Sequence, residues 1–263
     1  MDKTLRTAST GLTAQQRYVE IIANNLANVN TTGFKKTRPE FQDLLYETLR
    51  PAGGNRRTGT EPTNEVQIGS GTELVATTKQ FSQGDITETK SPLDMAINGD
   101  GFFIIRKPDN SVAYTRDGTF QLDRNGQIVT SQGFLLDPGF TVPDDAVEIQ
   151  VSRQGVVNVL LDGSLDEQAL GQIELARFVN PAGLRAVGDN LFVESPASGN
   201  AFFEEPGSNN TGELIQYHLE NANVDVVEEM VNMIVAQRAY EINSKAVSTA
   251  DNILSTAVNL KRS

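Results

Sequence analysis

The most informative features of the sequence at first are the residues that it lacks. Its 263 residues include no cysteine, no tryptophan and one histidine, and only 6% are aromatic. The absence of cysteine excludes disulfides, thiolate zinc sites and cysteine nucleophiles. A Ser-His-Asp triad would have to use His218, and a histidine that occurs once is more often structural or exposed.

Two short motifs resemble ligand sites but lack the residues that such sites need. "DRNG" at 123–126 resembles the start of a calcium loop, yet the twelfth position of that loop is Phe134 and not an acidic residue, so a hairpin turn is the better interpretation. "GSG" at 69–71 has neither the third glycine nor the flanking pattern of a dinucleotide site. No local spacing favours a catalytic carboxylate pair. We therefore expect no catalytic residue, no metal site and no cofactor, and a protein that is not an enzyme.

Long apolar runs and excess positive charge are also missing. No run approaches the 18 apolar residues of a membrane span, so we expect no membrane span. The net charge of −12 argues against a nucleic-acid partner. Met1 leads directly into an amphipathic stretch without an apolar core or cleavage site, so we expect any export to occur without a cleavable signal peptide.

The amino-terminal segment has the periodicity of a helix over residues 4–31. Apolar residues recur every seven positions and at the intervening +3 positions, which is the seam of a coiled coil. The first series is Leu5, Leu12, Val19 and Leu26, and the second is Ala8, Ile22 and Val29.

The carboxy-terminal segment predicts a second, longer helix over 224–260, because it contains neither proline nor glycine. Two apolar stripes run along it, and two stripes require more than one helical neighbour. One consists of Val235, Ala239, Ile242, Ala246, Ile253 and Leu260; the other consists of Met233, Ala236, Tyr240, Val247, Ala250, Leu254 and Ala257. A third row, Ser244, Ser248, Ser255 and Asn259, is small and polar and suits either water or a tight contact.

The middle of the chain predicts an all-β domain. Turn dipeptides separate short apolar or alternating runs, and their spacing is typical of hairpins. They include Asn98-Gly99, Asp117-Gly118, Asn125-Gly126, Gln132-Gly133, Gln154-Gly155 and Asp162-Gly163. Before this domain, the segment "RPAGGNRRTGTEPTN" at 50–64 is rich in proline and glycine and predicts no regular element.

Asparagines are concentrated where the first helix should end, in "ANNLANVNTTGFKK" at 23–36. We expect Gly33 to adopt the left-handed conformation that stops the helix, with Phe34 packed against Val29. Asn24, Asn25 and Asn28 would then project over more than one face of the helix. They are either exposed polar residues or hydrogen-bonding groups for neighbouring chains.

Three separated motifs give the sequence a resemblance to a known family. "STGLTAQQ" followed by "IIANNLANVNTTGFKK", the central "INGDGFFIIRKPDNSVAYTRDGTFQLDRNGQIVTSQGFLLD", and "NVDVVEEMVNMIVAQRAYEINSKAVSTADNIL" occur in that order. They resemble the signatures of bacterial flagellar rod and hook proteins. The length and the match at both ends point to the distal-rod branch of that family.

The resemblance implies an α+β fold in which the terminal helices pair as a coiled-coil inner layer and the β domain forms the outer layer. The expected divisions are 1–35 (helix), 36–70 (extended connector that includes 50–64), 71–221 (β domain) and 222–263 (helix). It also implies a self-assembling, hollow drive shaft that spans periplasm to outer membrane and encloses the export channel. Expected partners are further copies of the chain, proximal-rod and hook proteins, the surrounding peptidoglycan and outer-membrane rings, and the flagellar type III export apparatus.

Residue roles follow from the resemblance and the patterns together. The expected subunit-assembly residues are Leu5, Leu12, Val19, Ile22, Asn24, Asn25, Leu26, Asn28, Gly33, Phe34, Met233, Val235, Tyr240, Ile242, Val247, Ile253 and Leu254. Ser244, Ser248, Ser255 and Asn259 are the candidate channel lining. Phe41 and Leu45 match a pattern suspected of engaging the export gate, and a local packing pair is the alternative. A proximal-rod or hook protein, or a secreted coiled-coil binding module, remains an alternative for the whole chain.

Overall fold

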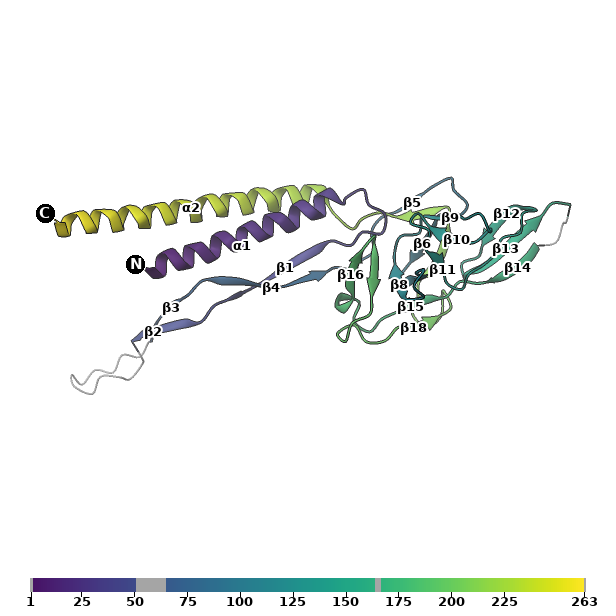
Figure 1. Ribbon diagram of the computed structural model, residues 1–263, viewed down its shortest axis with the longest axis horizontal. Helices are drawn as coiled ribbons and strands as arrows, with labels where there is room; N and C mark the ends of the chain where they lie inside the picture. Colours follow the sequence, from purple (N-terminus) through teal and green to yellow (C-terminus); the bar gives the residue numbers. More distant parts are fainter. Residues whose placement is uncertain (1, 51–64, 164–166, 263) are drawn as a thin grey trace. The chain divides into compact units, whose positions relative to one another are not determined.

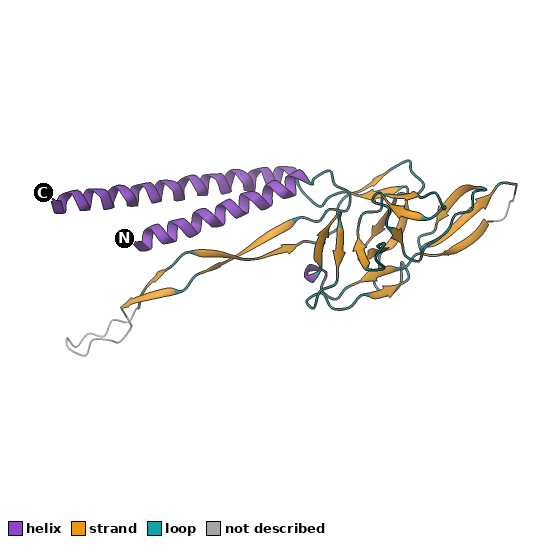
Figure 2. Cartoon of the chain, viewed as in Figure 1, coloured by secondary structure: helices purple, strands orange, loops and turns teal. Residues whose placement is uncertain are grey.

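The structure is a computed structural model that describes residues 2–50, 65–163 and 167–262. The chain folds into two compact units. Unit 1 comprises Met1–Leu26, Thr37–Thr78 and Val226–Ser263, and unit 2 comprises Ala27–Lys36 and Lys79–Asp225. The residue ranges place both long helices in the first unit, and the second unit consists almost wholly of strands and loops. Helices, strands and loops are distinguished by colour in Figure 2.

Unit 1 contains the two long helices that the sequence predicts, α1 (Asp2–Ala27) and α2 (Val226–Arg262). They lie in contact, with a ribbon of four strands beside them (Figure 1). In the ribbon, β1 (Thr37–Asp43) pairs with β4 (Thr72–Lys79), and β2 (Tyr46–Arg50) pairs antiparallel with β3 (Val66–Gly69). The prediction of two long, contacting terminal helices is confirmed.

The predicted stop of α1 at Gly33 is wrong. The helix ends at Ala27, and two successive turns follow, in which Thr31 N–H donates to Asn28 O (3.0 Å) and Phe34 N–H donates to Thr31 O (3.2 Å). Gly33 does have a positive φ of 66°, but its N–H donates to Glu220 O at 2.7 Å and not to a carbonyl of α1. The Asn28 side chain accepts a hydrogen bond from Thr31 Oγ1 (3.2 Å), and such local bonds compete with helix continuation.

The sequence did not reveal the ribbon. The proline and glycine content of the 50–64 segment predicted no regular element, yet β2 ends at Arg50, its first residue, and β3 begins at Val66, just after it. Residues 51–64 themselves lie outside the described part of the structure. The pairing of β1 with β4 and of β2 with β3 nevertheless places the chain before that segment beside the chain after it.

Unit 2 is built from antiparallel sheets, as the central sequence pattern predicts. The largest has nine strands, of which seven follow the order β16-β17-β8-β7-β11-β10-β9, and β15 pairs with both β7 and β18. A three-stranded sheet has the order β12-β13-β14, and two small sheets pair β19 with β6 and β20 with β5. The strand bounds are β5 Ile86–Glu88, β6 Met95–Asn98, β7 Phe102–Arg106, β8 Val112–Thr115, β9 Phe120–Leu122, β10 Ile128–Thr130, β11 Leu135–Leu136, β12 Ala146–Val151, β13 Val156–Leu161, β14 Glu167–Gln172, β15 Leu175–Arg177, β16 Arg185–Gly188, β17 Leu191–Val193, β18 Phe202–Glu204, β19 Glu213–Gln216 and β20 His218–Glu220. One turn of 3-10 helix covers Pro181–Gly183.

The predicted turn dipeptides close several of these hairpins. Asn125-Gly126 lies between β9 and β10, and Gln154-Gly155 lies between β12 and β13. In the first of these turns the Asp123 carboxylate accepts backbone hydrogen bonds from Asn125 and Gln127, both at 2.8 Å. The "DRNG" motif is therefore a hairpin turn, in which the carboxylate organises the backbone.

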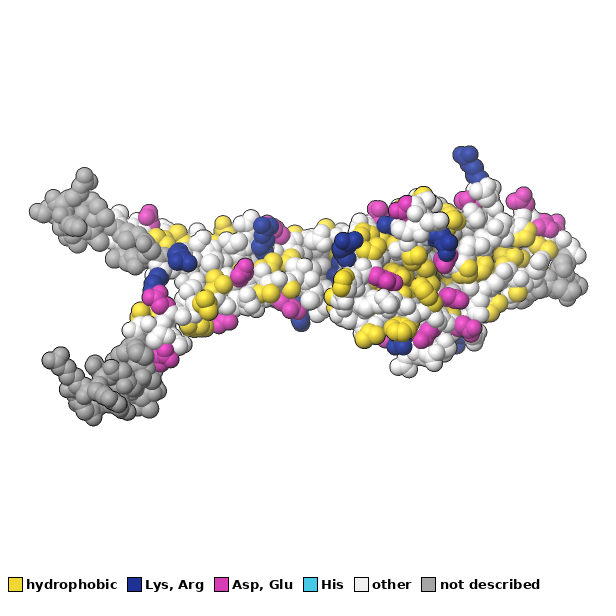
Figure 3. Space-filling model, turned by 60° about the horizontal axis from the view of Figure 1, so that its bottom comes forward, with side chains coloured by type: hydrophobic (Ala, Val, Ile, Leu, Met, Phe, Trp, Pro, Cys, Tyr) yellow, Lys and Arg dark blue, Asp and Glu magenta, His cyan; other side chains and the backbone are white. Residues whose placement is uncertain are grey.

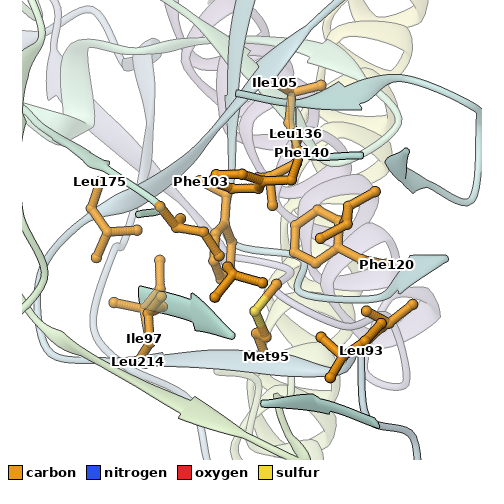
Figure 4. Close-up of a cluster of buried hydrophobic side chains, with 14 of the residues drawn as sticks. Leu93, Met95, Ile97, Phe103, Ile105, Phe120, Leu136, Phe140, Leu175 and Leu214 are labelled. Carbon is orange, nitrogen blue, oxygen red and sulfur yellow. The ribbon is translucent and has the colours of Figure 1, made fainter. Parts of the chain in front are cut away.

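The core of unit 2 lies on both faces of β7. Phe103 and Ile105 point into the larger apolar cluster, which also holds Met95, Leu136 and Leu175 (Figure 4). The alternate residues of the strand, Phe102 and Ile104, belong to a second cluster with Tyr114, Phe178 and Phe192. The "GFFII" run is continuous because successive side chains of one strand fill two different cores.

Candidate functional site

The helix surfaces of unit 1 are the candidate site, since most of the predicted assembly residues lie there. The α1 seam faces inward: Ala8 and Ile22 are buried, and Leu5, Leu12, Val19 and Leu26 are half-buried. Ala14, beside the seam, is also buried. On α2, one of the two predicted stripes is covered in the same way. Ala236 is buried, and Met233, Val247 and Ala250 are half-buried, although Tyr240 in this stripe stays 44% exposed.

The other stripe of α2 is largely exposed in the single chain, although Ala239 within it is half-buried. Val235 is 59% exposed, Ile242 is 69% exposed and Ile253 is 52% exposed. Further exposed apolar residues on the helix are Val227, Met230, Val231 and Ile234. Hydrophobic side chains are also visible among polar ones on the face of the molecule drawn in Figure 3. A row of exposed β-branched residues along a helix is the kind of surface that packs against another helix or chain. The side chain of Leu254 lies outside the described residues.

Asn25 forms a buried polar link among three elements of unit 1. Its side chain is 2% exposed, and its amide exchanges two hydrogen bonds with the Thr37 backbone at the start of β1, each 2.9 Å long. The same amide nitrogen donates to the Glu229 carboxylate on α2 at 3.3 Å. Both amide hydrogens of Asn25 are therefore used within the subunit. A contact of Asn25 with another subunit stays a prediction.

The remaining asparagines of the motif differ in exposure. Asn24 is exposed and Asn28 is half-buried, and Asn28 holds the turn after α1 through Thr31. Gly33 is buried and Phe34 is half-buried, and both lie in unit 2. Lys79 Nζ lies 5.1 Å from the centre of the Phe34 ring. Contacts of Asn24, Asn28, Gly33 and Phe34 with other subunits stay predictions.

Sequence reasoning missed a buried ionic cluster in unit 2. The side chains of Lys35, Glu220 and Arg116 are 0%, 1% and 4% exposed. Lys35 Nζ lies 2.6 Å from Glu220 Oε1, and Arg116 Nε lies 3.0 Å from Glu220 Oε2. Burial lowers the pKa of the Lys35 ammonium and of the Arg116 guanidinium, and the Glu220 carboxylate acts against that shift in both. The sequence offered only two lysines after a helix, a pattern that is usually solvated.

The candidate export-gate residues occupy different environments. The Phe41 ring, on β1, packs edge-on against Tyr18 of α1 with ring centres 6.2 Å apart, whereas Leu45, between β1 and β2, is 88% exposed. In the candidate channel lining, Ser244, Ser248 and Ser255 are exposed on α2, and the Asn259 side chain lies outside the described residues. An export role for the first pair and a lining role for the row stay predictions.

The described residues show no metal centre and no membrane helix. Across residues 2–50, 65–163 and 167–262, no three His, Cys, Asp or Glu side chains gather in a way that could hold a metal ion. None of the helices in that part of the chain is both long enough and apolar enough to cross a membrane. His218 Nδ1 lies 2.8 Å from the backbone oxygen of Gln216.

Comparison with known proteins first identifies the class of protein to which this chain belongs. Three family models match separate parts of the chain: "Flagella basal body rod protein" over residues 5–35, "Flagellar hook protein FlgE/F/G D1 domain" over 96–159, and "Flagellar basal body rod FlgEFG protein C-terminal" over 215–260. The fold and these matches define a structural protein of the flagellar axis, a family that is not enzymatic.

Relatives that match over their full length then distinguish a rod protein from a hook protein. The flagellar basal-body rod protein FlgG of Borreliella burgdorferi is 51% identical over 100% of both chains. Those of Caulobacter vibrioides and Bacillus subtilis are 48% identical over 98% of both chains and 40% identical over 100% of both chains. By contrast, the hook protein FlgE of Helicobacter mustelae is 41% identical over only 52% of this chain and 30% of its own length. The chain belongs to the FlgG family and is a structural subunit of the flagellar basal-body distal rod.

Proposed function

We propose that copies of this chain polymerise helically into a hollow shaft that transmits torque from the rotor to the hook and encloses the export channel. The observation that carries the proposal is the exposed stripe of α2. One stripe packs within unit 1, while Val235, Ile242 and Ile253 are each more than half exposed. An apolar surface of this extent on an isolated subunit favours burial against another subunit.

The ends of such a shaft define the remaining partners. Proximal-rod proteins and the hook protein would contact its two ends, and the peptidoglycan and outer-membrane rings would surround it between periplasm and outer membrane. The flagellar type III export apparatus would deliver the subunits. The exposed Ser244, Ser248 and Ser255 are small and polar, so they suit a channel through which unfolded chains pass.

Charge introduced into the exposed stripe tests polymerisation. Ile242→Lys should raise the critical concentration for assembly at least about tenfold, because burying one unpaired ammonium in an apolar contact costs more than 1.4 kcal/mol. Ile242→Val keeps the stripe apolar and is the matched control. Sedimentation and negative-stain images of both variants are the measurement. Wild-type-like polymers of the lysine variant would mean that this stripe is not an intersubunit surface.

Two further variants test the channel and the 50–64 segment. Ser248→Phe and Ser255→Phe should obstruct export of the flagellar components that pass through the channel later. Unchanged filament assembly would argue against these serines lining the channel. Deleting residues 50–64 should give a polymer that bends more readily, because the resemblance to distal-rod proteins implies that this segment wedges between neighbouring subunits. Straight, stiff rods from the deletion variant would leave that segment as a linker.

A further inference from the structure

Three stretches of chain meet inside unit 2 at the points where it is joined to unit 1. They are residues 33–36, which follow α1, residues 79–84, which follow β4, and residues 220–223, which precede α2. Three of the four boundaries between the units fall beside these stretches, after Lys36, after Thr78 and after Asp225, and the fourth lies after Leu26. A force that enters unit 2 along the backbone from β1, β4 or α2 therefore reaches one of these stretches within two residues.

A single carboxylate connects the three stretches. Glu220 Oε1 accepts from Lys35 Nζ at 2.6 Å and from the Gly84 N–H at 2.9 Å, while Glu220 Oε2 pairs with Arg116 Nε at 3.0 Å. Lys35 Nζ also donates to Ser82 O at 2.7 Å. Arg116 continues the network into the connection between β6 and β7, where its terminal nitrogens donate to backbone oxygens of Gly99 and Gly101, both at 2.8 Å.

Asn223 adds a second, uncharged set of cross-links. Its side-chain oxygen accepts from the Lys36 N–H at 2.7 Å, and its amide nitrogen donates to Gln80 O at 2.8 Å and to Ser82 O at 3.1 Å. The Gln80 N–H in turn donates to Lys36 O at 2.9 Å. Every pair among the three stretches is thus joined by at least one direct hydrogen bond.

The entry and exit stretches run in the same direction. Gly33 N–H donates to Glu220 O at 2.7 Å, and farther along both stretches Asn223 N–H donates to Phe34 O at 3.3 Å. Because the two stretches are parallel, pulling residues 33–36 toward the N-terminus and residues 220–223 toward the C-terminus slides the stretches past each other. Their cross-links then carry the load together and do not open one after another.

We infer that Lys35, Glu220, Arg116 and Asn223 form a mechanical tie, the junction clamp, that resists separation of the entry and exit stretches of unit 2. The ion pairs suit this role because charge-assisted hydrogen bonds out of contact with water are strong, and breaking them leaves buried charges without partners. A buried ion pair often adds little to equilibrium stability compared with apolar residues. Its effect should therefore be larger on the force needed to open the junction than on the stability of unit 2.

Force spectroscopy on the full-length monomer tests the clamp, and the outcome does not depend on polymerisation. Because the chain has no cysteine, engineered cysteines give unique attachment points. Asn30→Cys with Met230→Cys loads the junction, and both positions are exposed. Asp109→Cys with Gln154→Cys, also exposed, loads the sheets of unit 2 without passing through the junction.

Lys35→Met is the test variant, because it keeps the length of the side chain and leaves Glu220 paired with Arg116. Lys90→Met, at an exposed position of unit 2, is the matched control. Across the junction, we expect Lys35→Met to unfold at least about tenfold faster at constant force, since two charge-assisted hydrogen bonds are lost. Between residues 109 and 154 its rate should change less than threefold, about 0.6 kcal/mol. A similar acceleration along both directions, or none across the junction, would overturn the inference.

Discussion

Gly11 of α1 lies directly against Asn243 of α2. A Cβ atom added at residue 11 would stand 3.0 Å from Asn243 Nδ2 and 3.3 Å from Asn243 Cγ. A glycine in the middle of a helix costs about 1 kcal/mol relative to alanine. Its presence here is explained by the close approach of the two helices in unit 1.

A larger residue at this contact should therefore weaken assembly. Gly11→Leu should destabilise the helix pair by about 1–3 kcal/mol through overpacking, and so raise the critical concentration for polymerisation. Gly11→Ala combined with Asn243→Ala restores the space and should assemble like the wild type. The measurement is the critical concentration by sedimentation. Equal values for Gly11→Leu and the wild type would show that the helices do not pack this closely in the polymer.

Gly33 should tolerate no side chain, for two separable reasons. Its φ is +66°, and an added Cβ would lie 2.6 Å from the backbone carbon of Arg116 and the backbone nitrogen of Asp117. Gly33→Val should cost on the order of 3 kcal/mol in the free energy of unfolding, part from the positive φ and part from the clash.

Gly199 separates those two contributions. It has a similar φ of +75°, but an added Cβ would meet nothing within 4 Å. Gly199→Ala should therefore cost only the conformational strain, about 1–2 kcal/mol, and Gly33→Ala should cost more. Urea unfolding of the two alanine variants provides the comparison. Equal losses would mean that the backbone around Arg116 moves away without cost.

Tyr114 should make the stability of unit 2 sensitive to alkali. Its ring is 2% exposed and its hydroxyl donates to Glu194 Oε1 at 2.5 Å. Burial, and then the hydrogen bond and negative charge of Glu194, raise the pKa of this phenol above its ordinary value of 10.0. The folded state therefore holds its proton at a pH where the unfolded chain releases it, so stability is lost as pH rises above about 10.

The comparison of wild type with Tyr114→Phe isolates that titration. From pH 9 to pH 11 the free energy of unfolding should fall more for the wild type than for the variant. The difference should stay below ~1.4 kcal/mol per pH unit, which is the slope for the release of one full proton. Chemical unfolding at a series of pH values measures the difference. Parallel curves for the two proteins would show that the phenol titrates alike in both states.

Proteolysis of the monomer should distinguish its ends from its middle. With one stripe of α2 exposed and the α1 seam interrupted by Gly11, we expect α1 and α2 to order fully only in the polymer. In the monomer, trypsin should cut early after Arg17 and Arg238, both on exposed parts of the helices. It should not cut after Lys35, whose side chain is wholly buried.

Mass spectrometry of the first peptides released, for monomer and polymer side by side, provides the measurement. The helix segments that end at Arg17 and begin after Arg238 should be lost early from the monomer, and cleavage should stop before it reaches Lys35 and Asn223 of the junction clamp. In the polymer the same helix sites should be protected. Protected helices in a monomer that shows no oligomer by light scattering would contradict this prediction, and early cleavage after Lys35 would contradict the buried position of that lysine.

The sequence predicted those features that local pattern determines. Heptad spacing gave both helices to within a few residues, and the turn dipeptides gave the β character of the middle. It could not show that Lys35 and Glu220 form a buried pair, because 185 residues separate them and each has the local surroundings of an exposed residue. The sequence pattern predicted correctly that Gly33 has a positive φ, but it assigned that conformation to the end of α1. In the structure, Gly33 instead contacts Glu220 and the backbone of Arg116.

Unit 2 interrupts unit 1 in the manner of an inserted domain. Apart from the short stretch at 27–36, it is one continuous segment, residues 79–225, placed between β4 and α2. The helices and ribbon can therefore keep their mutual packing while the inserted segment grows, shrinks or is exchanged, provided that residues 33–36, 79–84 and 220–223 still close on one another. Such a chain is open to grafting, since a foreign β domain with those three stretches preserved could be displayed on the same helical scaffold. The greater length of the Helicobacter mustelae hook protein, of which the matched region covers 30%, is compatible with variation of this kind within one family.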